Sequence, residues 1–393
     1  MFEKRYRLNL VFNANKVYDR QIVEGIGEYL QAAQCDWDIY FEDDFRYRLD
    51  SLKSWKGDGI IADFDNPEVE EILKETDIPM VAIGGSYHHK DDYPRLPYVA
   101  TDNAALVKLA YEHLKRKGLP QFAFYGMPDT SYSRWSKERE HAFIEQVSSD
   151  GYHPHVNQGL CTTAELWDTA QQNLESWLQS LPKPIGIIAV TDSRARHLLQ
   201  ACDHLNILVP EEVAVIGIDN ESMARYLNRT ALSSVTQGCK QMGYEAAKIL
   251  HRMLSGYAVE NSLMIVDPTG IEERQSTDYR ALRDPYVIQA MHFIRHNACR
   301  GIKVAQVVDS VGISRTNLET RFIDEVGCSM HEQLHMTKFY RACELVTSTD
   351  LAFDEISRIC GYPSVQYMYT VMRKNIGMTP GEYRVSSRLN TGN

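Results

Sequence analysis

The chain has 393 residues, of which 44% are hydrophobic and 24% charged, a composition typical of a soluble globular protein with two or three domains. No stretch of 18 apolar residues occurs and the first apolar run is short, so we expect neither a membrane span nor a secretory signal. The 8 cysteines are scattered without a C-x-x-C pair, which predicts free thiols of a cytoplasmic protein and neither a disulfide framework nor a zinc site.

The formal net charge of -11 is unevenly distributed. Residues 281–393 carry 13 Lys+Arg and 11 Asp+Glu, whereas residues 1–280 carry 29 and 42. The acidity therefore belongs to the first part of the chain. The balance of +2 in the last part permits nucleic-acid binding but does not demonstrate it.

Short apolar runs alternate with amphipathic helical patterns from residue 8 onward. The expected strands cover 8–12, 37–41, 59–64, 78–85, 122–126, 185–190 and 213–219. The expected helices cover 19–33, 69–75, 103–118, 134–147 and 193–202. Because the order restarts at residue 122, the pattern predicts two successive α/β lobes, each a parallel sheet with helices on both faces.

Polar residues follow several of these strands, at the edge of the sheet where ligands bind in such folds. They are Asn13 and Asn15, then Asp63 and Asp65 on either side of Phe64, then Thr191 and Asp192, and finally Asp219 and Asn220. Carboxylates and amides match the vicinal hydroxyls of a sugar, and Phe64 would cover a C–H face. Taken singly, each residue is better explained as a helix cap or turn former. Their coincidence at successive strand ends favours a ligand site.

An enzyme is the main alternative for this first part. A dinucleotide-binding enzyme needs G-x-G-x-x-G between its first strand and helix, but that turn reads "NANKVYDR" and the "GIG" at 25–27 lies within a helix. A sugar-metabolising enzyme needs a nucleophile–base pair, a phosphate loop or a metal set, and none is recognisable.

The periodicity becomes wholly helical from residue 285. Residues 303–327 and 353–377 each predict a helix, a turn and a second helix, and 330–349 predicts one long connecting helix. Two helix-turn-helix units joined in this way are a DNA-reading arrangement. The connecting helix contains "HEQLH" (331–335), which matches the zincin pattern H-E-x-x-H, but no third ligand is evident and catalytic zinc is not expected.

Helical spacing against the apolar positions predicts which residues of the second helix of each unit face outward. In the first unit they are Arg315, Thr316, Glu319 and Thr320. In the second unit they are Val365, Gln366, Tyr369 and Thr370. Arg373, Lys374 and Lys338 are candidates for phosphate contacts.

Two segments of the first part resemble the effector domain of LacI/GalR-type regulators: "PYVATDNAALVKLAYEHLKRKGLPQFAFYG" and "IIAVTDSRARHLLQACDHLNILVPEEVAVIGIDNESMARYL". The resemblance implies a two-lobed periplasmic-binding-protein-like (type I) α/β domain that closes on a small ligand. It also implies that Arg139, in the family's Arg-x-x-Gly-aromatic segment with Ala142 replacing Gly, contacts that ligand. Asp219, and Thr191 or Asp192, match the family's polar ligand positions.

The last part resembles the AraC/XylS-type DNA-binding domain, above all in Gly377-Met378-Thr379-Pro380-x-x-Tyr383-Arg384. The resemblance implies that the helices near 314–324 and 364–374 enter successive major grooves. Thr320 and Thr370 stand where the family often has arginine, and Met368 and Met372 replace its phenylalanines. The threonines favour apolar contacts to thymine methyl groups, and Gln366 is suited to adenine.

The order of the parts is similar to that of xylose-responsive transcription activators. The resemblance implies a regulator whose effector is D-xylose, with no cofactor, acting as a homodimer on promoter DNA and in contact with RNA polymerase. We expect a sensor domain (1–272), a linker (273–284) and an all-α DNA-binding domain with two helix-turn-helix motifs (285–393). The expected sugar ligands are Asn13, Phe64, Asp65, Arg139, Thr191, Asp192 and Asp219. Another pentose, a hexose or a purine stays open as the effector.

Overall fold

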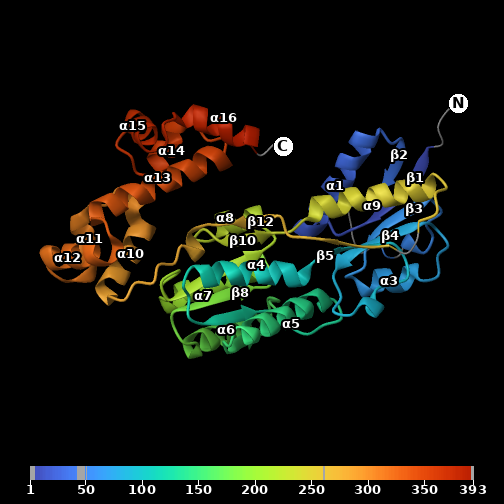
Figure 1. The fold of residues 1–393 in the computed structure, drawn as a ribbon, viewed down its shortest axis with the longest axis horizontal. Helices are drawn as coiled ribbons and strands as arrows, with labels where there is room; N and C mark the ends of the chain where they lie inside the picture. Colours follow the sequence, from blue (N-terminus) through green and yellow to red (C-terminus); the bar gives the residue numbers. More distant parts are fainter. Residues whose placement is uncertain (1–4, 42–48, 50, 260–261, 391–393) are drawn as a thin grey trace. The chain divides into compact units, whose positions relative to one another are not determined.

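The computed structural model describes residues 5–41, 49, 51–259 and 262–390 (Figure 1). The chain divides into two compact units, 1–279 and 280–393. The first unit contains two six-stranded sheets with helices packed on them, and the second is helical. The predicted fold class, a two-lobed periplasmic-binding-protein-like domain followed by an all-α domain, is confirmed.

Each sheet of the first unit forms the centre of one lobe. Lobe 1 has the strand order β11-β5-β4-β3-β1-β2, and lobe 2 has the order β12-β10-β9-β8-β6-β7. In lobe 1 the strands are β1 (Tyr6–Val11), β2 (Trp37–Tyr40), β3 (Gly59–Asp63), β4 (Met80–Gly85), β5 (Tyr98–Thr101) and β11 (Leu263–Val266). In lobe 2 they are β6 (Phe122–Tyr125), β7 (Pro154–Asn157), β8 (Ile185–Ala189), β9 (Val213–Ile218), β10 (Ser233–Thr236) and β12 (Gly270–Glu272).

The strand pairs are parallel, as predicted, except at one edge. There β12 pairs antiparallel with β10. The expectation of purely parallel sheets was therefore wrong at this edge, because β12 returns to the sheet directly from lobe 1 without a crossover helix.

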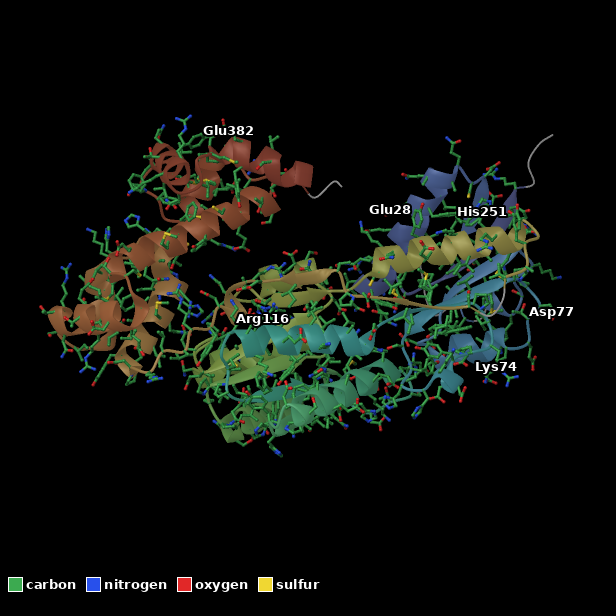
Figure 2. All side chains as sticks on the ribbon, in the orientation of Figure 1. Glu28, Lys74, Asp77, Arg116, His251 and Glu382 are labelled. Atoms are coloured by element: carbon green, nitrogen blue, oxygen red, sulfur yellow. The ribbon has the colours of Figure 1, made fainter. Side chains whose placement is uncertain are left out.

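In lobe 1, helices α1 (Val17–Ala33) and α9 (Cys239–Leu254) cover one face of the sheet, and α3 (Pro67–Leu73) packs on the other. Glycines let α1 and α9 approach closely: a Cβ on Gly25 would lie 1.9 Å from the Lys240 carbonyl oxygen. Figure 2 marks the two helices by Glu28 and His251. The "GIG" stretch within α1 thus serves helix packing.

In lobe 2, helices α4 (Asn103–Arg116) and α5 (Arg134–Ser149) cover one face, and α6 (Trp167–Ser180) and α7 (Asp192–Leu205) cover the other. A short helix, α8 (Ser222–Leu227), follows β9, and a 3-10 turn, η1 (Lys90–Asp92), precedes β5.

The lobes are not successive segments of the chain, which corrects the sequence prediction. Helix α4, expected in the first lobe, packs on lobe 2 through apolar residues such as Leu106 and Leu114. Helix α9 and strand β11, which follow β10 of lobe 2 in the sequence, pack in lobe 1. The chain therefore crosses between the lobes after β5, after β10 and after β11. Helical periodicity shows which face of a helix is buried, but not which sheet covers it.

The first residues of the expected linker belong to the first unit. Within 273–279 the 3-10 turn η2 (Gln275–Thr277) places Ser276 and Thr277 in the interior of lobe 2. The Ser276 hydroxyl donates to the Val215 carbonyl oxygen at 2.6 Å. These small polar residues look like linker in the sequence, but their hydroxyl groups are satisfied inside the fold.

The helical unit consists of two groups of three helices, and both groups pack against one long helix between them (Figure 1). The elements are α10 (Pro285–Asn297), η3 (Ala298–Arg300), α11 (Val304–Val311), α12 (Arg315–Val326), α13 (Met330–Ser348), α14 (Phe353–Ile359), α15 (Val365–Ile376) and α16 (Pro380–Asn390). The first group packs around Leu318 and Phe322, and the second around Met368 and Met372, all of which were predicted inward. Within the described ranges, no helix is long and apolar enough to cross a membrane.

Candidate ligand cavity and nucleic-acid interface

A cavity of about 820 Å³ lies in the first unit, where the carboxyl ends of both sheets meet. Its lining comes from both lobes and includes six of the seven residues predicted to bind the ligand. These are Asn13, Asp65, Arg139, Thr191, Asp192 and Asp219. The strand-end rule therefore located the cavity.

Phe64 does not line the cavity, and this part of the prediction was wrong. Its side chain is 3% exposed and packs in the lobe 1 core with Val11, Ile60 and Val69. The residue follows β3 directly, so it continues the alternation of the strand and turns toward the α3 face. The aromatic residues that line the cavity are Tyr18, Tyr132 and Trp135, the last at the start of α5.

Arg139 is buried, with 3% of the residue exposed, and three hydrogen bonds hold its guanidinium in place. It donates to Asn103 Oδ1 at 2.9 Å, to the Val190 carbonyl at 2.7 Å and to Gln237 Oε1 at 3.4 Å. The guanidinium carbon also lies 4.8 Å from the Trp135 ring centroid. Burial lowers the pKa of Arg139, and nearby Asp219 opposes that change. Since a guanidinium has five N–H donors, some remain for a ligand in the cavity.

Asp219 shows the clearest marks of a ligand-binding carboxylate. Its backbone has φ 116, a conformation that side-chain-bearing residues rarely adopt, and Oδ1 accepts from Gln237 Nε2 at 2.5 Å. Burial raises its pKa to about 6, while Arg139 and the bond from Gln237 act in the opposite direction. A strained backbone and an incompletely neutralised carboxylate are typical of functional sites.

Thr191 and Asp192 line the cavity but also serve the fold. Thr191 is the N-cap of α7 and accepts from the Arg194 amide. Asp192 accepts from the Ser234 hydroxyl at 2.6 Å and from the Glu221 amide at 2.7 Å, which ties α7 to β10 and to the loop after β9. Burial, followed by repulsion from Asp219, raises the pKa of Asp192. Thr191 therefore caps a helix and Asp192 stabilises the fold, which is the structural role that the sequence also allowed for strand-end residues.

The lobe 1 wall of the cavity combines acidic residues with a lysine. Asp63 pairs with Lys16 Nζ at 3.3 Å. Behind this wall, the buried carboxylate of Asp19 accepts from the Asn13 backbone amide at 2.5 Å. Burial and the charge of Asp63 raise the pKa of Asp19 to about 8. Asn13 Oδ1 accepts from the Asn15 backbone amide at 3.1 Å, a turn contact that leaves the Asn13 side-chain nitrogen Nδ2 for a ligand.

Asp65 is occupied by protein contacts on both carboxylate oxygens. Oδ2 accepts from the Gly85 amide at 2.8 Å, and Oδ1 pairs with the guanidinium of Arg134. Burial raises the pKa of Asp65, and Arg134 opposes that effect. Asp65 thus lies at the cavity wall with its acceptor positions largely used.

Several polar and aromatic residues that line the cavity were not predicted from the sequence. Gln237, which contacts both Arg139 and Asp219, follows β10, so the strand-end rule finds it once that strand is recognised. Trp135 lies one helical turn before Arg139, so helical spacing would have suggested it. Thr101, at the end of β5, donates to Gln237 Oε1 at 3.1 Å and belongs to the same group.

Helix α12 of the helical unit exposes the predicted residues Arg315, Thr316 and Thr320, while Glu319 is half-buried. Ser314 caps the helix by accepting from the Asn317 amide at 3.4 Å. The Thr320 hydroxyl donates to the Thr316 carbonyl at 3.0 Å, so its methyl group is the part left for an apolar contact.

Helix α15 repeats this arrangement. Ser364 is the N-cap, Gln366 and Thr370 are exposed, and the Thr370 hydroxyl donates to the Gln366 carbonyl at 3.0 Å. Val365 is half-buried. Tyr369 is half-buried as well, and its ring lies edge-on to that of Phe353 with the centroids 6.0 Å apart, so Val365 and Tyr369 face outward only in part.

Arg373 and Lys374, predicted to contact phosphates, are exposed in the last turn of α15. Lys338 is a different case, since its ammonium donates to the Gly361 carbonyl at 3.0 Å and is partly buried. That bond stabilises the end of α14, so the phosphate role considered for Lys338 is not supported.

The H-E-x-x-H pattern has a structural explanation. His331 and His335 lie on one face of α13 with ring centroids 4.5 Å apart. Glu332 forms a capping box with Ser329, accepting from its amide and its hydroxyl at 2.8 Å each. In the part of the chain that the structure describes, no group of three or more His, Cys, Asp or Glu side chains is arranged to hold a metal ion.

Family models match most of both units. The model described as XylR N-terminal domain matches residues 7–104, and the periplasmic binding protein-like domain matches 111–277. The helix-turn-helix domain model matches residues 307–386. An α/β sensor fold with a polar cavity, joined to two helix-turn-helix modules, defines the class of ligand-responsive transcription regulators.

The chain belongs to the family of xylose operon regulatory proteins. It is 57% identical to the xylose operon regulatory protein of Escherichia coli (strain K12) over 98% of both chains. It is 52% identical to the protein of that name from Haemophilus influenzae, over 98% of this chain and 100% of the relative. These relatives are DNA-binding transcription regulators, not enzymes, so the enzyme alternative is excluded.

Solved structures support the same assignment. A structure described as the xylose-binding transcription activator xylR shares 55% identity, has a TM-score of 0.90 and covers 98% of this chain and 99% of its own. The lac repressor dimer bound to operator and the anti-inducer ONPF has a TM-score of 0.55 at 13% identity over 70% of this chain and 95% of its own, which shows a shared sensor fold only.

Proposed function

We propose that this chain activates genes for xylose transport and catabolism when D-xylose binds in the cavity of its first unit. The observation that carries the proposal is the cavity itself, in which Arg139, Asp219 and Gln237 form one hydrogen-bonded group at the meeting of two sheets. Similarity to regulators and a solved activator whose names specify xylose supports the choice of sugar.

The chemistry of the cavity suits a neutral polyhydroxylated ligand. The carboxylate of Asp219 accepts hydrogen bonds from sugar hydroxyls, and Arg139 and Asn13 donate to hydroxyl oxygens. Trp135 offers an apolar ring for the C–H face of the sugar. Thr191 and Asp192 are placed to assist, but their contacts with the fold limit them to secondary roles.

Helices α12 and α15 are the proposed DNA readers. Gln366 suits the donor and acceptor pair of adenine in the major groove, and the methyl groups of Thr320 and Thr370 suit thymine methyls. Arg315 is suited to guanine or phosphate, and Arg373 and Lys374 to phosphates that position the helix. A homodimer in the cytoplasm, in contact with RNA polymerase, completes the proposal.

Calorimetric titration of the full-length protein tests the proposed effector. D-Xylose, another pentose, a hexose and a purine are each titrated under the same conditions. The proposal expects saturable binding of D-xylose to one site per chain and much weaker binding of the others. Tight binding of another compound, with no heat from D-xylose, would reassign the effector.

A further inference from the structure

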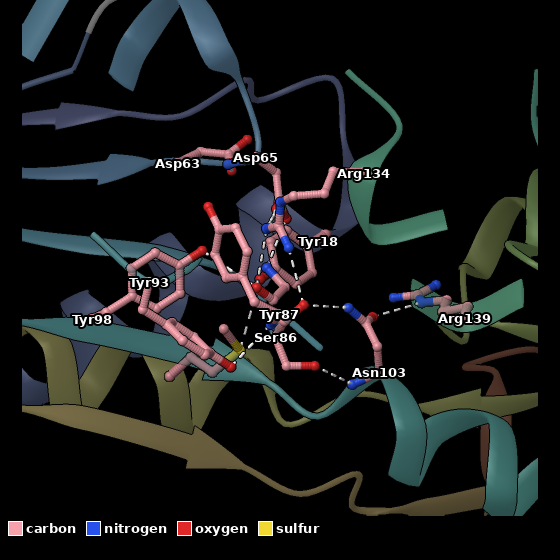
Figure 3. Close-up of polar contacts among 12 residues, drawn as sticks. Tyr18, Asp63, Asp65, Ser86, Tyr87, Tyr93, Tyr98, Asn103, Arg134 and Arg139 are labelled. Atoms are coloured by element: carbon pink, nitrogen blue, oxygen red, sulfur yellow. Dashed lines mark hydrogen bonds and ion pairs between the residues drawn. The ribbon is translucent and has the colours of Figure 1, made fainter. Parts of the chain in front are cut away.

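Arg134, the first residue of α5, belongs to lobe 2, but its side chain contacts lobe 1 (Figure 3). Its guanidinium pairs with Asp65, donates to the carbonyl oxygens of Gly85 and Ser86 at 3.0 Å each, and lies 3.6 Å from the Tyr87 ring centroid. All of these partners lie at or just after the carboxyl ends of β3 and β4 in lobe 1. One side chain thus holds the strand ends of the opposite lobe.

The ion pair is largely shielded from water. The Arg134 side chain is 24% exposed and the Asp65 side chain 8%. Exposed ion pairs contribute little to stability. Breaking a shielded and hydrogen-bonded pair is strongly destabilising, because it leaves one charge buried without a partner. Tyr132, two residues earlier, forms a second bridge by donating to Glu68 of α3.

These contacts continue into the ligand site. The Asn103 amide donates to the Ser86 hydroxyl at 3.1 Å, and Asn103 Oδ1 accepts from Arg139 at 2.9 Å (Figure 3). Ser86, whose carbonyl binds Arg134, is therefore also linked through Asn103 to the arginine of the cavity. Lobe contact and ligand contact belong to one hydrogen-bonded network.

We propose that Arg134 is a positioning residue that fastens the two lobes together, with Asp65 as its partner and not as a sugar ligand. The proposal deepens the proposed function, since it rests on a ligand that contacts both lobes. Without the ion pair, a smaller fraction of molecules has the lobes in contact, and the apparent affinity for any ligand between them falls in proportion.

Lobe separation measured without sugar tests this role independently of the effector. Spin labels are placed at Lys74 of lobe 1 and Asn173 of lobe 2 in the full chain, through unnatural amino acids that leave the native cysteines unlabelled. We expect Arg134→Gln and Asp65→Asn each to broaden the distance distribution toward longer distances. Unchanged distributions in both variants would overturn the proposal, because a residue that only contacts sugar leaves the sugar-free distances as they are.

Lys137→Gln is the matched control. It removes a cation from the same helix, where Lys137 pairs with Asp129 of the same lobe at 2.6 Å. Its distance distribution should equal that of the unmodified protein. A broadening in this control equal to that of Arg134→Gln would show a general effect of charge on α5 and overturn the specific role of Arg134.

Calorimetry with D-xylose completes the test as a double-mutant cycle. Arg134→Gln and Asp65→Asn should each weaken D-xylose binding about tenfold, and the double variant should be no weaker than the weaker single variant. Losses that multiply in the double variant would show two independent roles and overturn the pairing. If the unmodified protein does not bind D-xylose, the proposed function fails, while the distance measurement still decides the role of Arg134.

Discussion

The two units carry their proposed contacts in opposite environments. In the first unit, Arg139 is buried and Asp219 is half-buried, both hydrogen-bond to Gln237, and both have shifted pKa values. In the helical unit, Arg315, Gln366 and Thr370 are exposed on helices whose other faces are packed. A small ligand is enclosed by its site, whereas a DNA groove is met by a protein surface. Substitutions in the sensor should therefore affect folding and binding together, while those on the helices should affect binding alone.

The largest effect should come from Asp219→Ala. Removing this carboxylate leaves Arg139 without its nearby charge and removes an acceptor for sugar hydroxyls, so D-xylose affinity should fall by about hundredfold or more. DNA binding without sugar should stay measurable by fluorescence anisotropy. Asp203→Ala, at an exposed position on α7, is the control and should bind sugar normally. Unchanged D-xylose affinity in Asp219→Ala would refute the site.

The next largest effect on binding should come from Gln366→Ala, at an exposed position on α15. Loss of an amide that reads adenine should weaken specific DNA binding by about 1–3 kcal/mol and leave the salt dependence unchanged. Arg373→Ala is the contrasting variant, because loss of a phosphate contact should reduce the salt slope by about one. Titrations over a range of salt concentrations distinguish the two. A reduced slope in Gln366→Ala would assign that residue to the phosphates.

The pH dependence of sugar binding tests the burial of Asp219. Its pKa of about 6 in the folded protein lies above the ordinary value of 3.8. Protonation below about pH 6 removes the carboxylate acceptor, so D-xylose affinity should fall about tenfold from about pH 7 to about pH 5. For stability the sign is opposite: a raised pKa favours folding at low pH, and this contribution is lost as pH rises through about 6.

Asp219→Asn is the control for both pH effects, measured by calorimetry and thermal unfolding. It should bind D-xylose weakly with little pH dependence, and any stability advantage over the unmodified protein should shrink as the pH falls below about 6. Equal pH dependence in the two proteins would place the titrating group elsewhere.

The smallest effect should come from Thr370→Ser. Serine keeps the hydroxyl that binds the Gln366 carbonyl and removes only the methyl group. Specific DNA affinity should fall by about 0.5–1 kcal/mol, the scale of one buried methylene. Thr347→Ser, on α13 with a hydroxyl bound to the Cys343 carbonyl at 3.1 Å, is the control. An effect of the same size in the control would show that helix stability is measured, not a contact with thymine.

The sequence predicted the fold class because apolar runs and helical periodicity are local properties of the chain. It also predicted Asn13, Arg139 and Asp219 at one cavity, the first and last from strand-end topology and Arg139 from family resemblance. It did not predict that α4 covers lobe 2, because helical spacing does not specify the partner sheet. Phe64 was misplaced because it was grouped with the residues that follow the strand, whereas it continues the alternation of β3 and packs in the lobe 1 core with Ile60.

Asp65 and Arg134 show what a list of motifs omits. Asp65 was recognised as a strand-end carboxylate, but its engagement by a residue 69 positions later depends on the contact between the lobes. Arg134 precedes Arg139 in the same helix and had no motif to mark it. Long-range polar networks depend on side-chain reach in three dimensions, and a pattern along the sequence does not reveal them.

One linkage measurement decides whether sugar binding and DNA binding are coupled in this protein. Fluorescence anisotropy gives the affinity of the full-length protein for promoter DNA of the xylose genes with and without saturating D-xylose, and calorimetry gives D-xylose affinity with and without that DNA. We predict that D-xylose tightens DNA binding and that DNA tightens D-xylose binding by the same factor. DNA affinity that saturating D-xylose leaves unchanged would contradict the account.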